Sequence, residues 1–112
     1  MITKKKLGAM SDRSLRVLEE MAGMKLTFGN FLWSIRESEK TNQTDFAKRL
    51  ELSPQYLCDL ERGRRTVSPR VAAELAEKLG YSTQQFVRLA LQDEVNKAGL
   101  HYDVQLQQAK AA

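Results

Sequence analysis

The sequence predicts an all-α fold, a bundle of about five to six short helices with a possible β-strand at the C-terminal end. Three observations lead to this prediction. Apolar residues recur at helical spacing over most of the chain. Two Ser-Pro pairs, at 53–54 and 68–69, each indicate a helix start, because the serine can cap the helix and the proline fits its first turn. Residues 100–107 instead alternate apolar and polar side chains, as a half-buried strand does.

The composition is typical of one domain. The chain has 112 residues, of which 42% are hydrophobic, enough for a single compact core. Its formal net charge of +4 favours a polyanionic partner. A single cysteine, Cys58, argues against a disulfide and a cysteine-based metal cluster, and nothing in the sequence points to a cofactor. No apolar run has the length of a membrane span or a signal-peptide core, so we expect a cytoplasmic protein without a membrane partner.

The N-terminal part divides into a tail and two helices. Residues 1–10 contain three consecutive lysines and no sustained apolar period, and we expect a mobile basic tail there. Apolar residues at helical spacing predict a helix over 11–24. Thr27 can cap a second helix, which we expect to run to about Lys40. Its predicted buried face consists of Phe28, Phe31, Leu32 and Ile35.

Two very short helices follow. Asn42 is a good N-cap for the first of them. Ser53 caps the second, which begins at Pro54 and can be closed by a left-handed Gly63. The two helices share a predicted core of Phe46, Ala47, Leu50, Leu52, Leu57 and Leu60.

Two longer helices complete the predicted bundle. Ser68 caps a helix that ends before Gly80. Ser82 and Gln85 form a predicted capping box for the last helix, which should stop near Gly99.

The predicted strand over residues 100–107 lacks a partner, because no other segment of the sequence has a convincing β pattern. Its backbone groups would then pair in a second subunit or with another protein. The alternative is that residues 100–112 form a disordered tail.

Two short helices joined by a tight turn let the second one project at a steep angle and enter the DNA major groove. Over residues 28–80 this unit carries a set of polar and apolar residues at specific joint spacing: Arg36, Asn42, Gln43, Phe46, Ala47, Ser53, Leu57, Leu60, Glu61 and Gly63. In these residues the segment resembles the lambda-repressor-like, xenobiotic-response-element-type helix-turn-helix regulators. The resemblance implies a five-helix DNA-binding domain, which we expect within residues 11–99, acting as a homodimer on a palindromic double-stranded operator.

The resemblance also implies roles for individual residues. Positions that face base edges are occupied by Pro54, Gln55, Tyr56 and Asp59. Among these side chains, a glutamine can pair with adenine and an aspartate can accept a hydrogen bond from cytosine. Positions that contact the sugar-phosphate backbone are occupied by Asn42, Gln43, Ser53, Arg62, Arg64 and Arg65. Such contacts set affinity more than sequence preference.

Two further positions concern the scaffold. The resemblance implies a structural ion pair between Arg36 and Glu61. The sequence departs from the family at Glu51, where most members carry a glycine in a left-handed turn. We therefore expect strain in this turn and a gain in stability from Glu51→Gly.

Three classes of function can be compared with the sequence of the whole chain: an enzyme, an antitoxin and a free-standing repressor. An enzyme would have to rely on Cys58 and His101, which belong to no recognisable catalytic motif, so we predict no enzymatic activity and no catalytic residues. Residues 60–106 resemble antitoxins of the host-inhibition-of-growth type. This second resemblance implies a type II antitoxin that neutralises a RelE/ParE-like toxin and represses its own operon. The alternative is a free-standing phage-type or metabolic repressor without a toxin.

Overall fold

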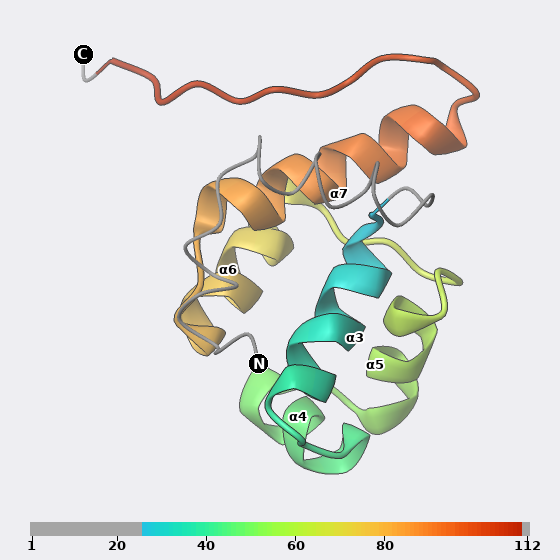
Figure 1. Cartoon of the computed structure of the whole chain (residues 1–112), viewed down its shortest axis with the longest axis vertical. Coiled ribbons are helices and arrows are strands. Elements are labelled where there is room, and N and C mark those ends of the chain that lie inside the picture. Colours follow the sequence, from blue (N-terminus) through green and yellow to red (C-terminus); the bar gives the residue numbers. More distant parts are fainter. Residues whose placement is uncertain (1–25, 111–112) are drawn as a thin grey trace.

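The computed structural model describes residues 26–110, so the predicted tail 1–10 and helix 11–24 lie outside the described residues. The described part contains five helices (Figure 1): α3 (Phe28–Ser38), α4 (Gln43–Leu50), α5 (Pro54–Glu61), α6 (Pro69–Leu79) and α7 (Thr83–Lys97). Residues 26–110 include no β-strand. The all-α prediction is therefore confirmed.

Each helix begins at the capping residue that the sequence predicts. The side-chain oxygens of Thr27, Asn42, Ser53, Ser68 and Ser82 each accept a hydrogen bond from the backbone N–H three residues later. The predicted capping box of α7 is only half formed, because Gln85 is buried and its Oε1 accepts no hydrogen bond from the described residues. The capping serines and prolines thus fix the start of each helix in the region that matters for function.

The helix ends are set by left-handed backbone positions. Helix α3 ends at Ser38, two residues before the expected Lys40, because Lys40 has a φ of 53° and cannot continue the helix. Helix α6 ends at Leu79, and the Gly80 that follows it has a φ of 77°, as predicted. Helix α7 ends at Lys97, close to the predicted stop near Gly99.

Helix α7 lies across one end of the bundle, and α3 runs from it toward α4 and α5 (Figure 1). The aromatic centre of the core is a group of three phenylalanine rings. Phe86 makes edge-to-face contacts with Phe28 and Phe31, with ring centroids 5.7 and 5.5 Å apart. These contacts tie α3 to α7 and so fix the frame on which α4 and α5 are mounted.

Gly29 marks the closest approach between α3 and α5. A Cβ atom added at this position would lie 2.1 Å from the carbonyl oxygen of Leu60. No side chain larger than hydrogen fits there without a shift of backbone. Gly29 therefore sets the spacing between α3 and the C-terminal end of α5.

Residues 100–110 form an extended segment that runs back along α7 in the opposite direction (Figure 1). The buried amide of Gln92 holds it at two points, donating to the carbonyl oxygen of Tyr102 and accepting from the N–H of Val104, both at 2.8 Å. Gln84 donates to the carbonyl oxygen of Leu106 at 2.9 Å. The predicted strand 100–107 is thus absent from the described residues, since side chains and not a second strand meet its backbone.

Candidate nucleic-acid interface

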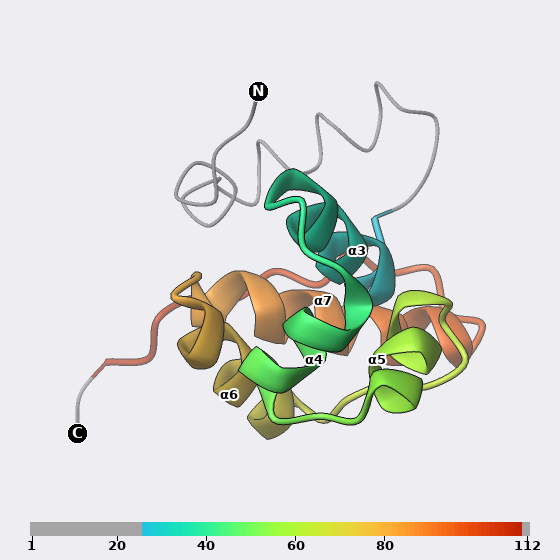
Figure 2. The ribbon, with the colours of Figure 1, turned by 90° about the horizontal axis from the view of Figure 1, so that it is seen from below.

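Helices α4 and α5 form a compact pair joined by a three-residue turn, and α4 lies between α5 and α6 (Figure 2). Their shared core is the predicted one. Phe46, Ala47, Leu50, Leu57 and Leu60 are buried, and Leu52 is partly buried against them. This apolar seam fixes the angle between the helices, and the opposite side of α5 is left facing solvent.

The turn between the two helices has the left-handed geometry expected of a glycine, although the residue is Glu51. Its φ is 58° and its ψ is 39°. Lys78 of α6 pairs with it, with 2.7 Å between Lys78 Nζ and Glu51 Oε2. The hydrogen bond from Lys78 and its charge hold the pKa of the Glu51 carboxyl below its ordinary value. The turn therefore keeps its shape while carrying a side chain that costs backbone strain.

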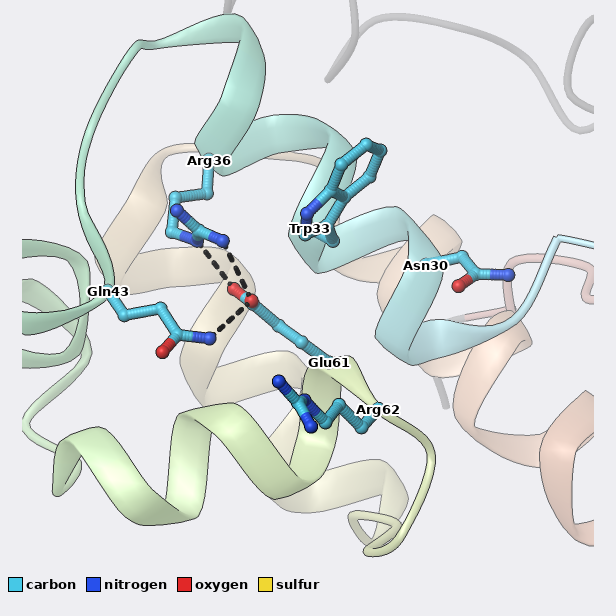
Figure 3. Close-up of a pocket in the computed structure, with 6 residues that line it drawn as sticks. All are labelled: Asn30, Trp33, Arg36, Gln43, Glu61 and Arg62. Carbon is cyan, nitrogen blue, oxygen red and sulfur yellow. Dashed lines mark hydrogen bonds and ion pairs between the residues drawn. The ribbon is translucent and has the colours of Figure 1, made fainter.

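Arg36 and Glu61 join α3 to the end of α5 beneath the exposed surface (Figure 3). Arg36 Nε lies 2.8 Å from Glu61 Oε2, and Nη2 lies 3.0 Å from Oε1. The two side chains are only 11% and 3% exposed. Arg36 also donates to the carbonyl oxygen of Thr41 at 3.1 Å. The hydrogen bond to Glu61 raises the pKa of Arg36, with burial acting in the opposite direction.

Gln43, at the first position of α4, joins the same carboxylate. Its Nε2 donates to Glu61 Oε1 at 2.9 Å (Figure 3). Glu61 therefore binds α3 through Arg36 and α4 through Gln43, and it belongs itself to α5. A glutamine amide nitrogen carries two hydrogens, so one N–H of Gln43 remains for another acceptor.

Asn42 and Ser53 are exposed, and both already cap helices. Asn42 Oδ1 accepts from the N–H of Asp45 at 2.8 Å, and its Nδ2 donates to Asp45 Oδ2 at 3.3 Å. Ser53 Oγ accepts from the N–H of Tyr56 at 3.1 Å. Each side chain keeps one polar hydrogen that these bonds do not use.

The outer face of α5 carries a connected row of polar side chains. Gln55 Nε2 donates to Asp59 Oδ1 at 3.0 Å, and Arg64 Nη1 lies 3.3 Å from the same oxygen. Gln55 and Pro54 are exposed, whereas Tyr56 and Asp59 are half-buried. The row thus places Gln55 outermost, with its amide oriented by Asp59.

An arginine-rich loop follows α5. Arg62, Arg64 and Arg65 are all exposed, and no acidic residue occurs between Arg62 and Arg70. The guanidinium of Arg65 lies over the ring of Tyr56, 4.6 Å from its centroid. The predicted base-facing residues therefore lie on α5, and the predicted phosphate-facing residues lie at the start of α4, at the N-cap of α5 and in the loop after α5.

The structure adds two residues that the sequence did not single out. Asn30 and Trp33 of α3 line an open pocket together with Arg36, Gln43, Glu61 and Arg62 (Figure 3). The signal was present in the sequence, because Trp33 falls at the edge of the apolar face of α3. Its neighbours in the pocket come from α4 and α5, and their positions depend on tertiary packing.

Other kinds of site have little basis in the part of the chain that the structure describes. Cys58 lies half-buried on α5 and His101 is exposed in the extended segment after α7. Within residues 26–110 no group of three or more His, Cys, Asp and Glu side chains is placed to hold a metal ion. None of the described helices combines the length and apolar character needed to cross a membrane.

Comparison with known families gives one match. Residues 34–86 match the helix-turn-helix family model. The matched segment includes all of α4, α5 and α6, and it carries the site residues described above except Asn30 and Trp33. Comparisons with curated proteins and with solved structures found no match. Residues 34–86 thus form a helix-turn-helix domain, the DNA-binding module of transcription regulators.

Proposed function

We propose that this helix-turn-helix protein is a sequence-specific transcriptional repressor that binds a palindromic operator as a homodimer. The observation that carries the proposal is the outer face of α5, which presents Gln55 on a short helix bordered by exposed arginines. A dimer would place two copies of α5 in successive major grooves about 34 Å apart. Bound there, it would block access of RNA polymerase to the promoter.

In this proposal Gln55 reads adenine. A glutamine binds adenine by accepting from N6 and donating to N7. The bond from Gln55 Nε2 to Asp59 uses one hydrogen of the amide and leaves the second hydrogen and the oxygen for the base. Asp59 then acts first by orienting Gln55 and Arg64, and contact with cytosine would require it to release one of them.

The backbone contacts are assigned to Gln43 and the arginine loop. Arg62 is exposed, and its side chain makes no ion pair with residues 26–110. Each phosphate neutralised by such a cation releases counterions, so the logarithm of the binding constant should fall by about 0.9 per contact for each tenfold rise in salt. Asn42 and Ser53 can each donate their remaining hydrogen to a phosphate oxygen.

The test is selection of bound duplexes from a randomised pool, followed by affinity measurement for three variants. Gln55→Ala should relax the choice at one base pair in each half-site, a loss of about 1–3 kcal/mol of discrimination. Arg62→Ala and Arg64→Ala should weaken binding to all sequences alike. Relaxed base choice in the arginine variants, with uniform weakening in Gln55→Ala, would contradict these roles.

We further propose that the repressor is the antitoxin of a type II pair, neutralising a RelE/ParE-like toxin and repressing their shared operon in the cytoplasm. Support comes from the likeness of residues 60–106 to antitoxins and from the extended segment that ends the chain. Leu100 and Tyr102 in that segment are 49% and 68% exposed. Exposed apolar side chains on an extended segment suit contact with another protein.

Co-purification with the product of an adjacent short reading frame tests the antitoxin role. The antitoxin should bind that product and suppress its toxicity on co-expression, and removal of residues 100–112 should weaken this binding while DNA binding persists. A protein that binds its operator and has no such neighbour or partner would be a free-standing repressor.

A further inference from the structure

Trp33 is an unusually exposed aromatic residue on the helical body of the protein. It is 49% exposed, while four other residues of α3 that surround it in sequence are buried: Phe31, Leu32, Ile35 and Phe28. Burying an indole ring is favourable because it removes a large apolar surface from water, and half of this ring stays in water. A ligand that covers the ring would recover this free energy.

The pocket beside Trp33 has a volume of about 450 Å³ and opens on the same side of the molecule as the end of α5 (Figure 3). Three helices build it. Asn30 and Trp33 come from α3, Gln43 from the start of α4, and Arg62 from the cap of α5. The pocket is thus lined in part by Gln43 and Arg62, which we have assigned to phosphate contacts.

The charge of the pocket favours an anion. Its one carboxylate, Glu61, is paired with Arg36 and also accepts from Gln43, so its negative charge is compensated. Arg62 adds a positive charge that none of the described acidic residues pairs with. Asn30, Gln43 and the indole N–H of Trp33 add neutral donors around it.

We propose that this pocket takes the sugar-phosphate backbone of one nucleotide at the border of the operator, with its phosphate toward Arg62 and its deoxyribose against the ring of Trp33. Trp33 and Asn30 thereby become DNA-contacting residues in addition to those on α4 and α5. The inference rests on the proposed DNA binding, and it adds the surface of α3 to the interface. Since the contact involves no base edge, it contributes affinity and register and no base preference.

Trp33 supplies its own readout, because the chain contains a single tryptophan. The full-length protein is titrated with a random-sequence duplex of about 24 base pairs, long enough for two half-sites, at low salt. Indole emission and its quenching by acrylamide are recorded at each step, and anisotropy of a labelled duplex reports binding independently. We expect the acrylamide quenching constant of Trp33 to fall at least about twofold on saturation, because the duplex covers the ring.

Substitutions separate the ring contact from the charge contact. Covering about half of the exposed indole surface corresponds to about a tenfold loss of affinity in Trp33→Ala, with an unchanged salt slope because no charge is lost. Trp33→Phe keeps a ring and should recover most of this loss. Arg62→Ala should instead reduce the salt slope by about 0.9. Circular dichroism confirms that each variant is folded.

The outcomes are distinguishable. If the wild-type protein binds the duplex while Trp33 stays as accessible to acrylamide as in the free protein, the inference is wrong and the proposed function stands. The same holds if Trp33→Ala is folded and binds within about twofold of the wild type. If the wild-type protein binds neither the random duplex nor any selected sequence, both proposals fail. Protection of Trp33 by a protein partner but not by DNA would also overturn the inference.

Discussion

Removing the buried carboxylate of Glu61 should strongly destabilise the protein. The variant Glu61→Ala leaves the guanidinium of Arg36 buried, with the carbonyl oxygen of Thr41 and the exposed carboxylate of Glu37 as its remaining partners. It also removes the acceptor of Gln43. Three helices lose their common contact in one substitution.

The size of the effect follows from the geometry. Two unit charges about 4 Å apart attract by about 4 kcal/mol at an effective dielectric constant of 20. Side-chain exposures of 11% for Arg36 and 3% for Glu61 leave little room for solvent to replace the lost partner. Breaking such a pair costs about 3–5 kcal/mol. A domain of this size has a free energy of unfolding of about 5–15 kcal/mol, so the variant should lose a large fraction of its stability.

A double-mutant cycle in urea, followed by circular dichroism, measures the pair directly. Arg36→Met, Glu61→Leu and the double variant should show a coupling energy of about 3 kcal/mol, because the double variant leaves no unpaired charge. Glu37→Ala is the matched control, since Glu37 lies 3.6 Å from the same guanidinium and is 53% exposed. Glu37→Ala should lower the free energy of unfolding by less than about 0.5 kcal/mol. If the losses of unfolding free energy in the two single variants sum to the loss in the double variant within about 0.5 kcal/mol, the reasoning is refuted.

Three further substitutions test separate features of the fold. Gly29→Ala should lower the free energy of unfolding by about 1–3 kcal/mol, because its Cβ would lie 2.1 Å from the Leu60 carbonyl oxygen; an unchanged urea midpoint would contradict the close approach. Glu51→Gly should raise the thermal midpoint by about 4–8 °C by relieving the left-handed strain, whereas Glu51→Ala keeps the strain and should not; a midpoint that does not rise in Glu51→Gly would remove the claim. Burial raises the pKa of Asp93, so the folded state holds its proton more tightly than the unfolded state, and this residue makes stability fall as pH rises from about 4 through the raised pKa. Asp93→Asn should abolish that part of the pH dependence, and identical pH profiles of thermal midpoint for the two proteins would show that Asp93 contributes none.

The predictability of the fold and the site differs from residue to residue. The starts of the helices could be read from the sequence, because a capping serine or asparagine and a following proline act within one turn of backbone. The end of α3 could not, since Lys40 takes a left-handed conformation that its residue type does not favour. The alternation over residues 100–107 predicted a strand, yet a strand requires a second strand, and in the described chain the side chains of Gln84 and Gln92 bind this backbone instead.

In the candidate site, too, some features could be predicted from the sequence and others depend on tertiary packing. Gln55 could be placed on the outer face of α5 from helical spacing alone. The bond between Gln43 and Glu61 could not be predicted, because the residues are 18 positions apart and meet only after three helices have packed. Trp33 was visible as an edge residue of α3, and its pocket becomes visible only when α4 and α5 are in place.

The shared carboxylate of Glu61 divides the surface into positions with different evolutionary freedom. Gln43 faces the exterior and also anchors α4, so a change that altered its contact with a ligand would weaken the fold as well. The side chain of Gln55 is exposed and donates to Asp59, a half-buried neighbour on its own helix, so it can be replaced without disturbing the core. Under the roles proposed above, a lineage could therefore acquire a new operator by changing Gln55 on the outer face of α5, while Gln43 and Glu61, which also hold the helices together, stayed constant.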